Sequence, residues 1–564
     1  MGYSLFRRKP IHDIMHDKTD AEAHQHIGLS RVLTVRDLTF FGIAAIIGAG
    51  IFSTTGLASY NGGPAVSLLF VFTAIACVFT ALSYAQFAST VPVSGSAYTY
   101  AYVAFGEIFA WVIGWALILE YAVSNMVVAI SWSEYFTSML SGFGITFPKY
   151  LATDYGSASR AFALVEQTKQ AGTSLSTLPE NTRVLADAWA NAPLVGGVHL
   201  IANLPAGAIT VLITALVYIG IKESRTASNI LVVLKLAVIL LVIGVGAFYV
   251  KPANWSPFAP NGVAGVMSGV ASVFFAFIGF DSISTTAEEC KNPQRDLPRA
   301  MLYCLAICTV LYVLITLVLT GMVNYKELGV SDPLAYVFQK VDLNFVAGVI
   351  SVSAVVAITS ALLVYQLGQP RIWMTMSRDG LLWKRFSTIH PKYKTPSFAT
   401  IVTGFLVAIP SLFMDLKFFV DLTSVGTFFA FILVCAGILY LDAKGLTAQS
   451  KFKVPYINGK YLIGAVLLAV LGYALTTGHL VQTLESKPLL IVFWSVWVVL
   501  AVQGFRYNFS LLPVIGVLTN LYLMTELGAS NWQIFGIWLL IGLVIYFSYG
   551  FRKSKLAMKE PLSV

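Results

Sequence analysis

The sequence predicts an all-α integral membrane protein in which two inverted five-span halves are followed by four further spans. Of its 564 residues, 57% are hydrophobic and 11% are charged, whereas soluble proteins carry about 25% charged residues. Apolar runs of roughly 20 residues, the length that crosses a bilayer, recur from Leu38 to the C-terminus. Two of these runs are interrupted by glycine. These observations predict about 14 transmembrane helices, of which spans 1 and 6 are discontinuous.

The predicted spans divide the chain into consecutive parts. The spans cover approximately 38–60, 64–90, 107–138, 203–221, 228–250, 263–288, 299–323, 345–376, 398–414, 417–441, 460–477, 488–505, 510–526 and 531–550. We expect an N-terminal arm at 1–37 and a first five-helix repeat at 38–250. The inverted second repeat is expected at 263–441, four additional helices at 460–550 and a C-terminal tail at 551–564.

The distribution of basic residues supports this topology. Of the 36 Lys and Arg residues, 26 fall in segments on the side of the N-terminus, 9 fall on the opposite side, and Lys235 lies inside a span. Cytoplasmic loops are enriched in Lys and Arg, so we expect a multi-pass protein of the plasma or inner membrane with both termini in the cytoplasm. The net charge of +9 then reflects ordinary cytoplasmic-side charges and does not indicate nucleic-acid binding.

The segment 140–202 is predicted to be a large external insert. Its middle, 160–190, mixes Leu and Val with charged residues at loosely helical spacing. This pattern favours a folded loop with a short amphipathic helix over the alternative of a disordered insert.

The five cysteines are expected to be small buried side chains. They lie in or beside apolar runs, and no pair has the spacing of a metal site. They are Cys77, Cys290, Cys304, Cys308 and Cys435. We therefore expect no disulfide, no metal and no cofactor.

The first interrupted span contains the stretch 41–52, which reads FGIAAIIGAGIF. Gly48 and Gly50 lie in the middle of an apolar run, where glycine costs about 1 kcal/mol relative to alanine in a helix. Backbone groups that leave a helix inside the membrane are tolerated only where they face protein or a water-filled cavity. The glycines therefore predict either a ligand site on a discontinuous helix or close packing of two helices.

The sixth span has a matching interruption. Residues 272–289 place Gly279 within an apolar run and follow it with Asp281 and several hydroxyl side chains. Spans 1–5 begin inside and spans 6–10 begin outside, so the interruptions occupy corresponding positions of two inverted halves. Such a pair is the best sequence indication of a transporter's binding site, and it favours the ligand-site interpretation.

The chemistry of the two interruptions suits a zwitterion. Helix N-termini freed around Gly48 and Gly50 would offer N–H donors and a positive dipole end to a carboxylate. Carbonyl groups freed in the sixth span would receive an ammonium group, and apolar residues would surround the side chain. The candidate substrate-binding residues are Ile46, Gly48, Ala49, Gly50, Phe275, Ala276, Phe277, Ile278 and Gly279.

Three ionisable residues lie deep in predicted spans: Lys235, Glu120 and Asp281. Charges inside a membrane are costly and are functional candidates by default. A lysine in an apolar interior can take up and release a proton near neutral pH, so we assign Lys235 to proton coupling, with Glu120 and Asp281 as its candidate partners. The alternatives are a fixed ion pair of Lys235 with one of these acids and, for Glu120, an ordinary polar contact between helices.

The stretch 277–298, FIGFDSISTTAEECKNPQRDLP, closely resembles the sixth-span signature of the cationic amino acid transporter family, within the amino acid–polyamine–organocation superfamily. The resemblance extends through 91–100 (VPVSGSAYTY), 377–381 (SRDGL) and 511–524 (LLPVIGVLTNLYLM). It covers most of the chain except the insert around 150–200.

The resemblance implies a LeuT-type fold, a substrate held at the unwound parts of spans 1 and 6, and a span-five lysine that replaces the sodium ion of other relatives. Lys235 lies at the position of that lysine. Ala49 departs from the pattern, because some relatives carry a Thr or Ser hydroxyl there.

These features predict a secondary active transporter, a proton-coupled L-amino acid symporter of broad specificity that favours neutral amino acids and works by alternating access. The alternatives are a cationic amino acid uniporter or exchanger, for Arg, Lys or ornithine, and an amino acid sensor with a transporter fold. The expected partners are the amino acid, the proton and membrane lipid, with no nucleic acid and no obligate protein partner.

Enzyme and channel functions are not favoured. The sequence has no HExxH, no GxSxG in a loop, and no third glycine after Gly48 and Gly50 to complete a dinucleotide fingerprint. A channel is expected to carry a selectivity filter or a ring of pore residues repeated by symmetry. This single chain has two broken helices of different sequence instead.

Overall fold

The computed structural model describes residues 7–8, 33–90, 96–175, 178–220, 225–286, 290–330, 332–447, 450–476 and 487–559. This part of the chain is almost entirely helical. Its one sheet is a hairpin of two short strands, β1 (Leu194–Val195) and β2 (Val198–His199), in the insert at 140–202.

Helices occupy the positions of the predicted spans. The first span contains α2 (Val35–Ile46), the π-helical turn η1 (Gly50–Thr54) and α3 (Thr55–Gly62), and the sixth contains α11 (Gly262–Met267), α12 (Val270–Phe275) and the 3₁₀ helix η7 (Phe280–Thr286). The other helices at these positions are α4 (Val66–Thr90), α6 (Glu107–Gly142), α9 (Leu204–Ile219), α10 (Arg225–Gly246), α13 (Pro293–Met322), α15 (Asn344–Arg378), α16 (Ser397–Phe413), α17 (Leu416–Ala443), α18 (Leu462–Thr476), α20 (Leu490–Tyr507), α21 (Leu511–Thr525) and α22 (Ala529–Ile545).

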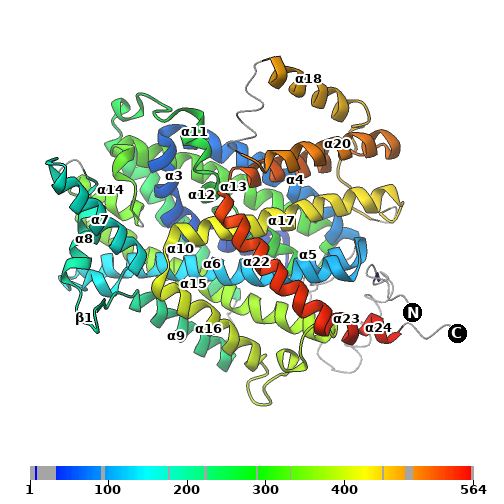
Figure 1. Cartoon of the computed structure of the whole chain (residues 1–564), viewed down its shortest axis with the longest axis horizontal. Coiled ribbons are helices and arrows are strands. Elements are labelled where there is room, and N and C mark those ends of the chain that lie inside the picture. The colour runs from blue at the N-terminus through cyan, green and yellow to red at the C-terminus, as the bar shows by residue number, and fades with distance from the viewer. Residues whose placement is uncertain are drawn as a thin grey trace.

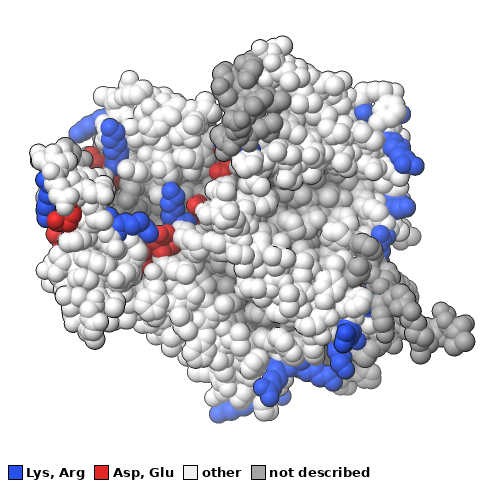
Figure 2. Space-filling view, in the orientation of Figure 1, with Lys and Arg blue, Asp and Glu red and all other residues white. Residues whose placement is uncertain are grey.

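The apolar helices identify a multi-pass membrane protein. Within the described ranges, nine helical stretches are long and apolar enough to cross a membrane, and four shorter apolar helices accompany them. Figure 2 shows charged residues gathered at the left end and along the right and lower edges, with a broad uncharged band between them. The count of fourteen crossings and the inverted repeat stay predictions.

Helix α6 lies at the centre of the bundle and is antiparallel to α15 (Figure 1). Trp132 of α6 donates to the Thr359 hydroxyl at 2.8 Å, and Gln369 of α15 donates to the Ile118 carbonyl at 3.1 Å. The C-terminal helix α22 is joined to α6 by two reciprocal bonds, because the Trp115 and Trp538 indoles each donate to the other residue's carbonyl, at 2.7 and 2.9 Å. Helix α6 is therefore joined both to α15 and to the C-terminal helix α22.

The insert at 140–202 is folded. It contains α7 (Tyr155–Gln170) and α8 (Glu180–Asn191), which pack on each other, where the sequence indicated one short helix. The Asp154 side chain caps α7 by accepting from the Ser157 N–H at 2.7 Å, as expected for a helix N-cap. The insert is tied to the helical body by the Arg160–Asp415 ion pair at 2.7 Å.

Both ends of the described chain meet at one end of the bundle (Figure 1). Arg7 donates to the Phe551 carbonyl at 3.3 Å, and the Glu107 N–H donates to the Arg7 carbonyl at 2.7 Å. The Glu107 carboxylate is fully buried and accepts from the hydroxyls of Tyr102 at 3.1 Å, Tyr546 at 3.0 Å and Ser554. This cluster is consistent with an even number of spans.

Candidate substrate-binding site

The first break separates α2 from η1. The N–H groups of Ile47 and Gly48 turn back to the carbonyls of Ile43 and Ile46, at 2.8 and 3.0 Å, and the helix resumes at Gly50. The first N–H groups of a helix have no partner within that helix. The break therefore leaves the N–H groups of Ala49 and Gly50, at the start of the new helix, free to bind a ligand. Single π-helical turns are frequent at functional sites.

The second break follows α12. Gly279 has φ of +114°, a conformation that favours glycine over residues with a Cβ atom, and η7 starts at the next residue. Asp281 stabilises this start, because its carboxyl group is hydrogen-bonded to backbone groups of Gly279 and Ser282. The sequence therefore terminates one helix and begins another within an apolar segment.

The two breaks lie directly against each other. A Cβ atom on Gly50 would be 2.6 Å from Ala276 Cα, and a Cβ atom on Gly279 would be 3.0 Å from the carbonyl carbon of Ala45. Each broken helix thus has a glycine at the point where the backbone of the other broken helix comes closest to it. Close packing, which the sequence left as an alternative to ligand binding, is present at Gly50 and Gly279 together with the freed backbone groups.

Side chains from other helices occupy several of the freed carbonyls. The Tyr312 hydroxyl of α13 lies 2.7 Å from the Ala276 carbonyl and 3.1 Å from the Ile46 carbonyl, so one proton is shared between the two broken helices. The Tyr135 hydroxyl of α6 donates to the Phe52 carbonyl at 2.5 Å. Sequence reasoning missed both tyrosines; the available signal was a phenol within an apolar span, whose hydroxyl needs a partner.

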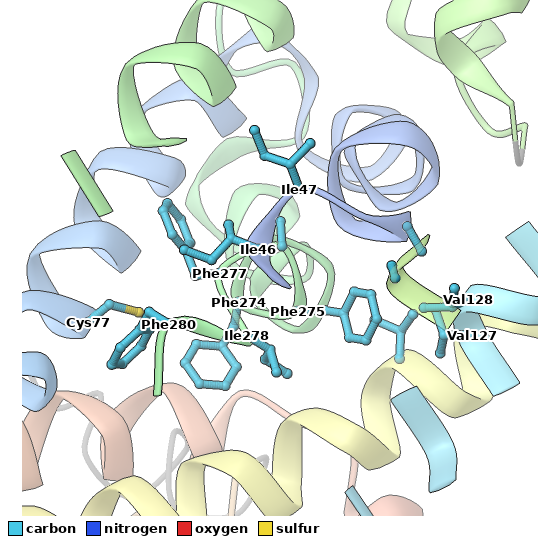
Figure 3. Close-up of a cluster of buried hydrophobic side chains, with 14 of the residues drawn as sticks. Ile46, Ile47, Cys77, Val127, Val128, Phe274, Phe275, Phe277, Ile278 and Phe280 are labelled. Atoms are coloured by element: carbon cyan, nitrogen blue, oxygen red, sulfur yellow. The ribbon is translucent and has the colours of Figure 1, made fainter. Parts of the chain in front are cut away.

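The aromatic residues of the sixth span point in different directions. Phe275 points toward Val127 and Val128 of α6 (Figure 3). The Phe277 ring packs against Phe70 and Tyr312, with centroids 6.1 and 5.3 Å away, on the side of α4 and α13. Of these two candidate residues, Phe275 is therefore the one that faces α6.

The three deep ionisable residues are all buried. Lys235 is 1% exposed, and its ammonium donates to the Ala44 carbonyl at 3.3 Å, near the end of α2. The Glu120 carboxyl of α6 lies beside the Thr427 side chain of α17, and it is close enough to Asp281 for the two acidic groups to repel each other. Each acid thus lies beside another helix or is bonded to its own backbone.

All nine candidate substrate-binding residues are buried and lie on the two breaks or in the turns beside them. Gly48 faces α15, because a Cβ atom there would be 3.1 Å from the Ala361 side chain. The five cysteines are free and buried. Glu288 and Glu289, which follow the second break, lie outside the described residues.

A family model described as amino acid permease matches residues 33–502, and a model for the permease C-terminus matches residues 510–554. The chain belongs to the amino acid permease family. This membership confirms the resemblance inferred from the motifs, and it means that the broken helices are part of a permease.

Relatives of the permease cover its whole length. It is 38% identical to the branched-chain amino acid permease BcaP of Bacillus subtilis (strain 168), over 99% of this chain and 100% of the relative. It is 35% identical to the methylthioribose transporter of the same strain, over 98% and 99%. It is 31% identical to the vacuolar cationic amino acid transporter 2 of Arabidopsis thaliana, over 99% and 94%. All three names are those of permeases or transporters.

Proposed function

We propose that this permease is a proton-coupled symporter of L-amino acids that favours neutral, apolar side chains. The observation that carries the proposal is the contact between two broken helices at Gly50 and Ala276. The break in the first span leaves N–H groups free, and the break in the sixth span, which lies against it, leaves carbonyl groups free. This combination suits the carboxylate and ammonium groups of an α-amino acid.

The carboxylate would bind at the start of η1. Ala49 and Gly50 supply N–H groups there, and the positive end of the helix dipole favours an anion. Ala49 has no hydroxyl, so this contact depends on the backbone. The ammonium group would lie at the carbonyls of Phe277 and Ile278, since the neighbouring carbonyl of Ala276 is occupied by Tyr312.

The preference for apolar side chains rests on the surface that faces the breaks. Phe275, Val127 and Val128 meet there (Figure 3), and burying a valine- or leucine-sized side chain against such a surface contributes about 1.5–3 kcal/mol. The similarity to a branched-chain amino acid permease supports the same substrate class.

Proton coupling is assigned to Lys235. Its ammonium donates to the Ala44 carbonyl of α2, two residues before that helix ends at Ile46. Protonated Lys235 stabilises this position of α2, whereas a neutral amine in an apolar interior binds the carbonyl less strongly. Proton release would then free the first broken helix to move.

Transport would follow alternating access. The broken helices belong to two inverted five-helix repeats, and the repeats rock around a fixed site near the membrane midplane. The protein would lie in the cell membrane with both termini in the cytoplasm, in agreement with the bias of Lys and Arg.

The proposal is tested by counterflow of labelled leucine in proteoliposomes, with each of the twenty amino acids and the common polyamines as competitors. We expect exchange, with valine, leucine and isoleucine competing best and polyamines not competing. Binding without exchange would identify an amino acid sensor. Preferential competition by arginine, lysine or ornithine would contradict the neutral preference and support a cationic amino acid uniporter or exchanger.

A further inference from the structure

One face of α6 is directed at the broken helices along more than four helical turns. At 3.6 residues per turn its members fall within an arc of roughly 100°. They are Glu120, Ser124, Val127, Val128, Ser131 and Tyr135.

Contacts at three levels show where this face points. Near one end, the Tyr135 hydroxyl binds the Phe52 carbonyl in η1. In the middle, Val127 and Val128 face Phe275 (Figure 3). At the other end, Glu120 is close enough to Asp281, beyond the second break, for the two acidic groups to repel each other. The residues between these levels therefore also face the candidate substrate site.

Ser124 lies on this face between Glu120 and Val127, and its hydroxyl is unsatisfied. The side chain is 0% exposed, and the hydroxyl has no hydrogen-bond partner within the described part of the chain. A helical hydroxyl can bond back to the carbonyl four residues earlier, as Thr210 does at 2.8 Å. A buried polar group without a partner costs roughly 1–3 kcal/mol, so Ser124 is a candidate ligand-binding group.

Helix α17 brings a second unsatisfied hydroxyl to the same level. Thr427 of α17 lies beside Glu120, and its hydroxyl donates to the Thr423 carbonyl at 3.2 Å. Helices α6 and α17 pack on each other, and they run antiparallel in the predicted topology. One turn from the Thr427–Glu120 contact, Thr423 and Ser124 are therefore opposite each other. The Thr423 hydroxyl is also 0% exposed and unpartnered among the described residues.

We infer that Ser124 and Thr423 form a hydrogen-bonding subsite beside Val127 that binds the side-chain hydroxyl of threonine or serine. This inference rests on the proposed function and narrows its substrate class. Threonine has nearly the shape of valine, so an apolar surface alone distinguishes the two poorly, whereas hydroxyl groups placed to bind the substrate hydroxyl favour threonine. The permease would accept short hydroxylated amino acids together with aliphatic ones.

The test compares threonine and valine as competitors of leucine counterflow in the wild type, Ser124→Ala and Thr423→Val. One hydrogen bond is worth about 0.5–1.5 kcal/mol, so the concentration of threonine that halves exchange should rise about threefold to tenfold in each variant. The value for valine should stay unchanged or fall, because an unsatisfied hydroxyl is removed. Thr423→Ser, which keeps the hydroxyl, should retain the wild-type ratio.

Ser411→Ala is the matched control. Ser411 is also a fully buried helical serine, but its hydroxyl already donates to the Ala408 carbonyl at 2.9 Å, so the ratio should not change. If the half-inhibitory concentrations of threonine and valine rise equally in Ser124→Ala, the subsite does not exist, and the Ser124 hydroxyl has a structural role or binds a water molecule. Unchanged values for both would overturn it as well. If neither amino acid competes in the wild type, the proposed function itself is wrong.

Discussion

Gly50 and Ala276 are in backbone contact, since a Cβ atom built on Gly50 would lie 2.6 Å from Ala276 Cα. Real Cβ contacts are essentially never this short, and the atom that would have to move is backbone. The first broken helix can therefore approach the second only while residue 50 is glycine. This contact places the donors of η1 beside the carbonyls that follow α12.

Substitution of Gly50 should abolish substrate binding and leave membrane insertion intact. In Gly50→Leu the side chain would push the two breaks apart and misplace the N–H donors, so we expect loss of leucine binding by more than tenfold. Gly244→Ala is the control, because nothing lies within 4 Å of a Cβ atom at this helical glycine. Wild-type affinity in Gly50→Leu would mean that the glycines serve only helix packing.

Removal of the Tyr312 hydroxyl should weaken transport. Tyr312→Phe leaves the Ile46 and Ala276 carbonyls without their shared donor, and a buried group left unsatisfied costs roughly 1–3 kcal/mol. We expect leucine affinity to fall about fivefold to a hundredfold, as measured by counterflow. Tyr303→Phe, on the same helix but 53% exposed, should behave as the wild type. An unchanged affinity in Tyr312→Phe would show that the bridge does not position the breaks.

Asp332, the N-cap residue of α14 (Pro333–Lys340), should make stability depend on pH. Burial and the neighbouring Glu134 raise the pKa of Asp332 from 3.8 to about 7, while Lys149 and Ser138 act in the opposite direction. Because the pKa is raised in the folded state, the folded protein binds the proton more tightly than the unfolded chain. The stabilisation is present below about pH 4 and is lost as the pH rises through about 7.

The measurement for Asp332 is the melting temperature of the purified protein between pH 5 and 8. The wild type should lose stability toward pH 8, and Asp332→Asn should flatten this part of the profile. Asp342→Asn is the control, because Asp342 is exposed, follows the same short helix and has a positive φ of 60° that asparagine tolerates. Identical slopes for the wild type and Asp332→Asn would refute the assignment.

The buried carboxylate of Glu107 should make the C-terminal segment important for stability. Hydrogen bonds to a charged group contribute about 1.5–3 kcal/mol, and Tyr546 donates one at 3.0 Å. Tyr546→Phe should lower the melting temperature by several degrees. Tyr549→Phe, three residues later, should leave it unchanged. Equal melting temperatures of wild type and Tyr546→Phe would show that the cluster does not stabilise the protein.

The positions of the helices and of both breaks could be predicted from the sequence because their causes are local. Long apolar runs specify the helices, and glycines at 48, 50 and 279 mark the interruptions. The direction of Phe277 could not be predicted in this way. It lies in the irregular segment between α12 and η7, where helical periodicity no longer relates residue number to direction.

The residues that sequence reasoning missed act through distant contacts. Tyr312 binds a carbonyl 266 positions earlier in the chain, and Tyr135 binds one 83 positions earlier. Ser124 and Thr423 are ordinary helical residues until α6 and α17 are brought together. Only the assembled bundle shows that their hydroxyls have no hydrogen-bond partner among the residues that the structure describes.

The central claim is that Lys235 couples amino acid transport to protons, and uptake of labelled leucine into proteoliposomes under an inward proton gradient tests it most directly. We predict that the gradient stimulates initial uptake in the wild type and in the exposed control Lys251→Ala, whereas Lys235→Ala still exchanges leucine but shows no stimulation. If initial uptake by the wild type does not depend on the proton gradient and is stimulated by sodium instead, proton coupling through Lys235 is contradicted.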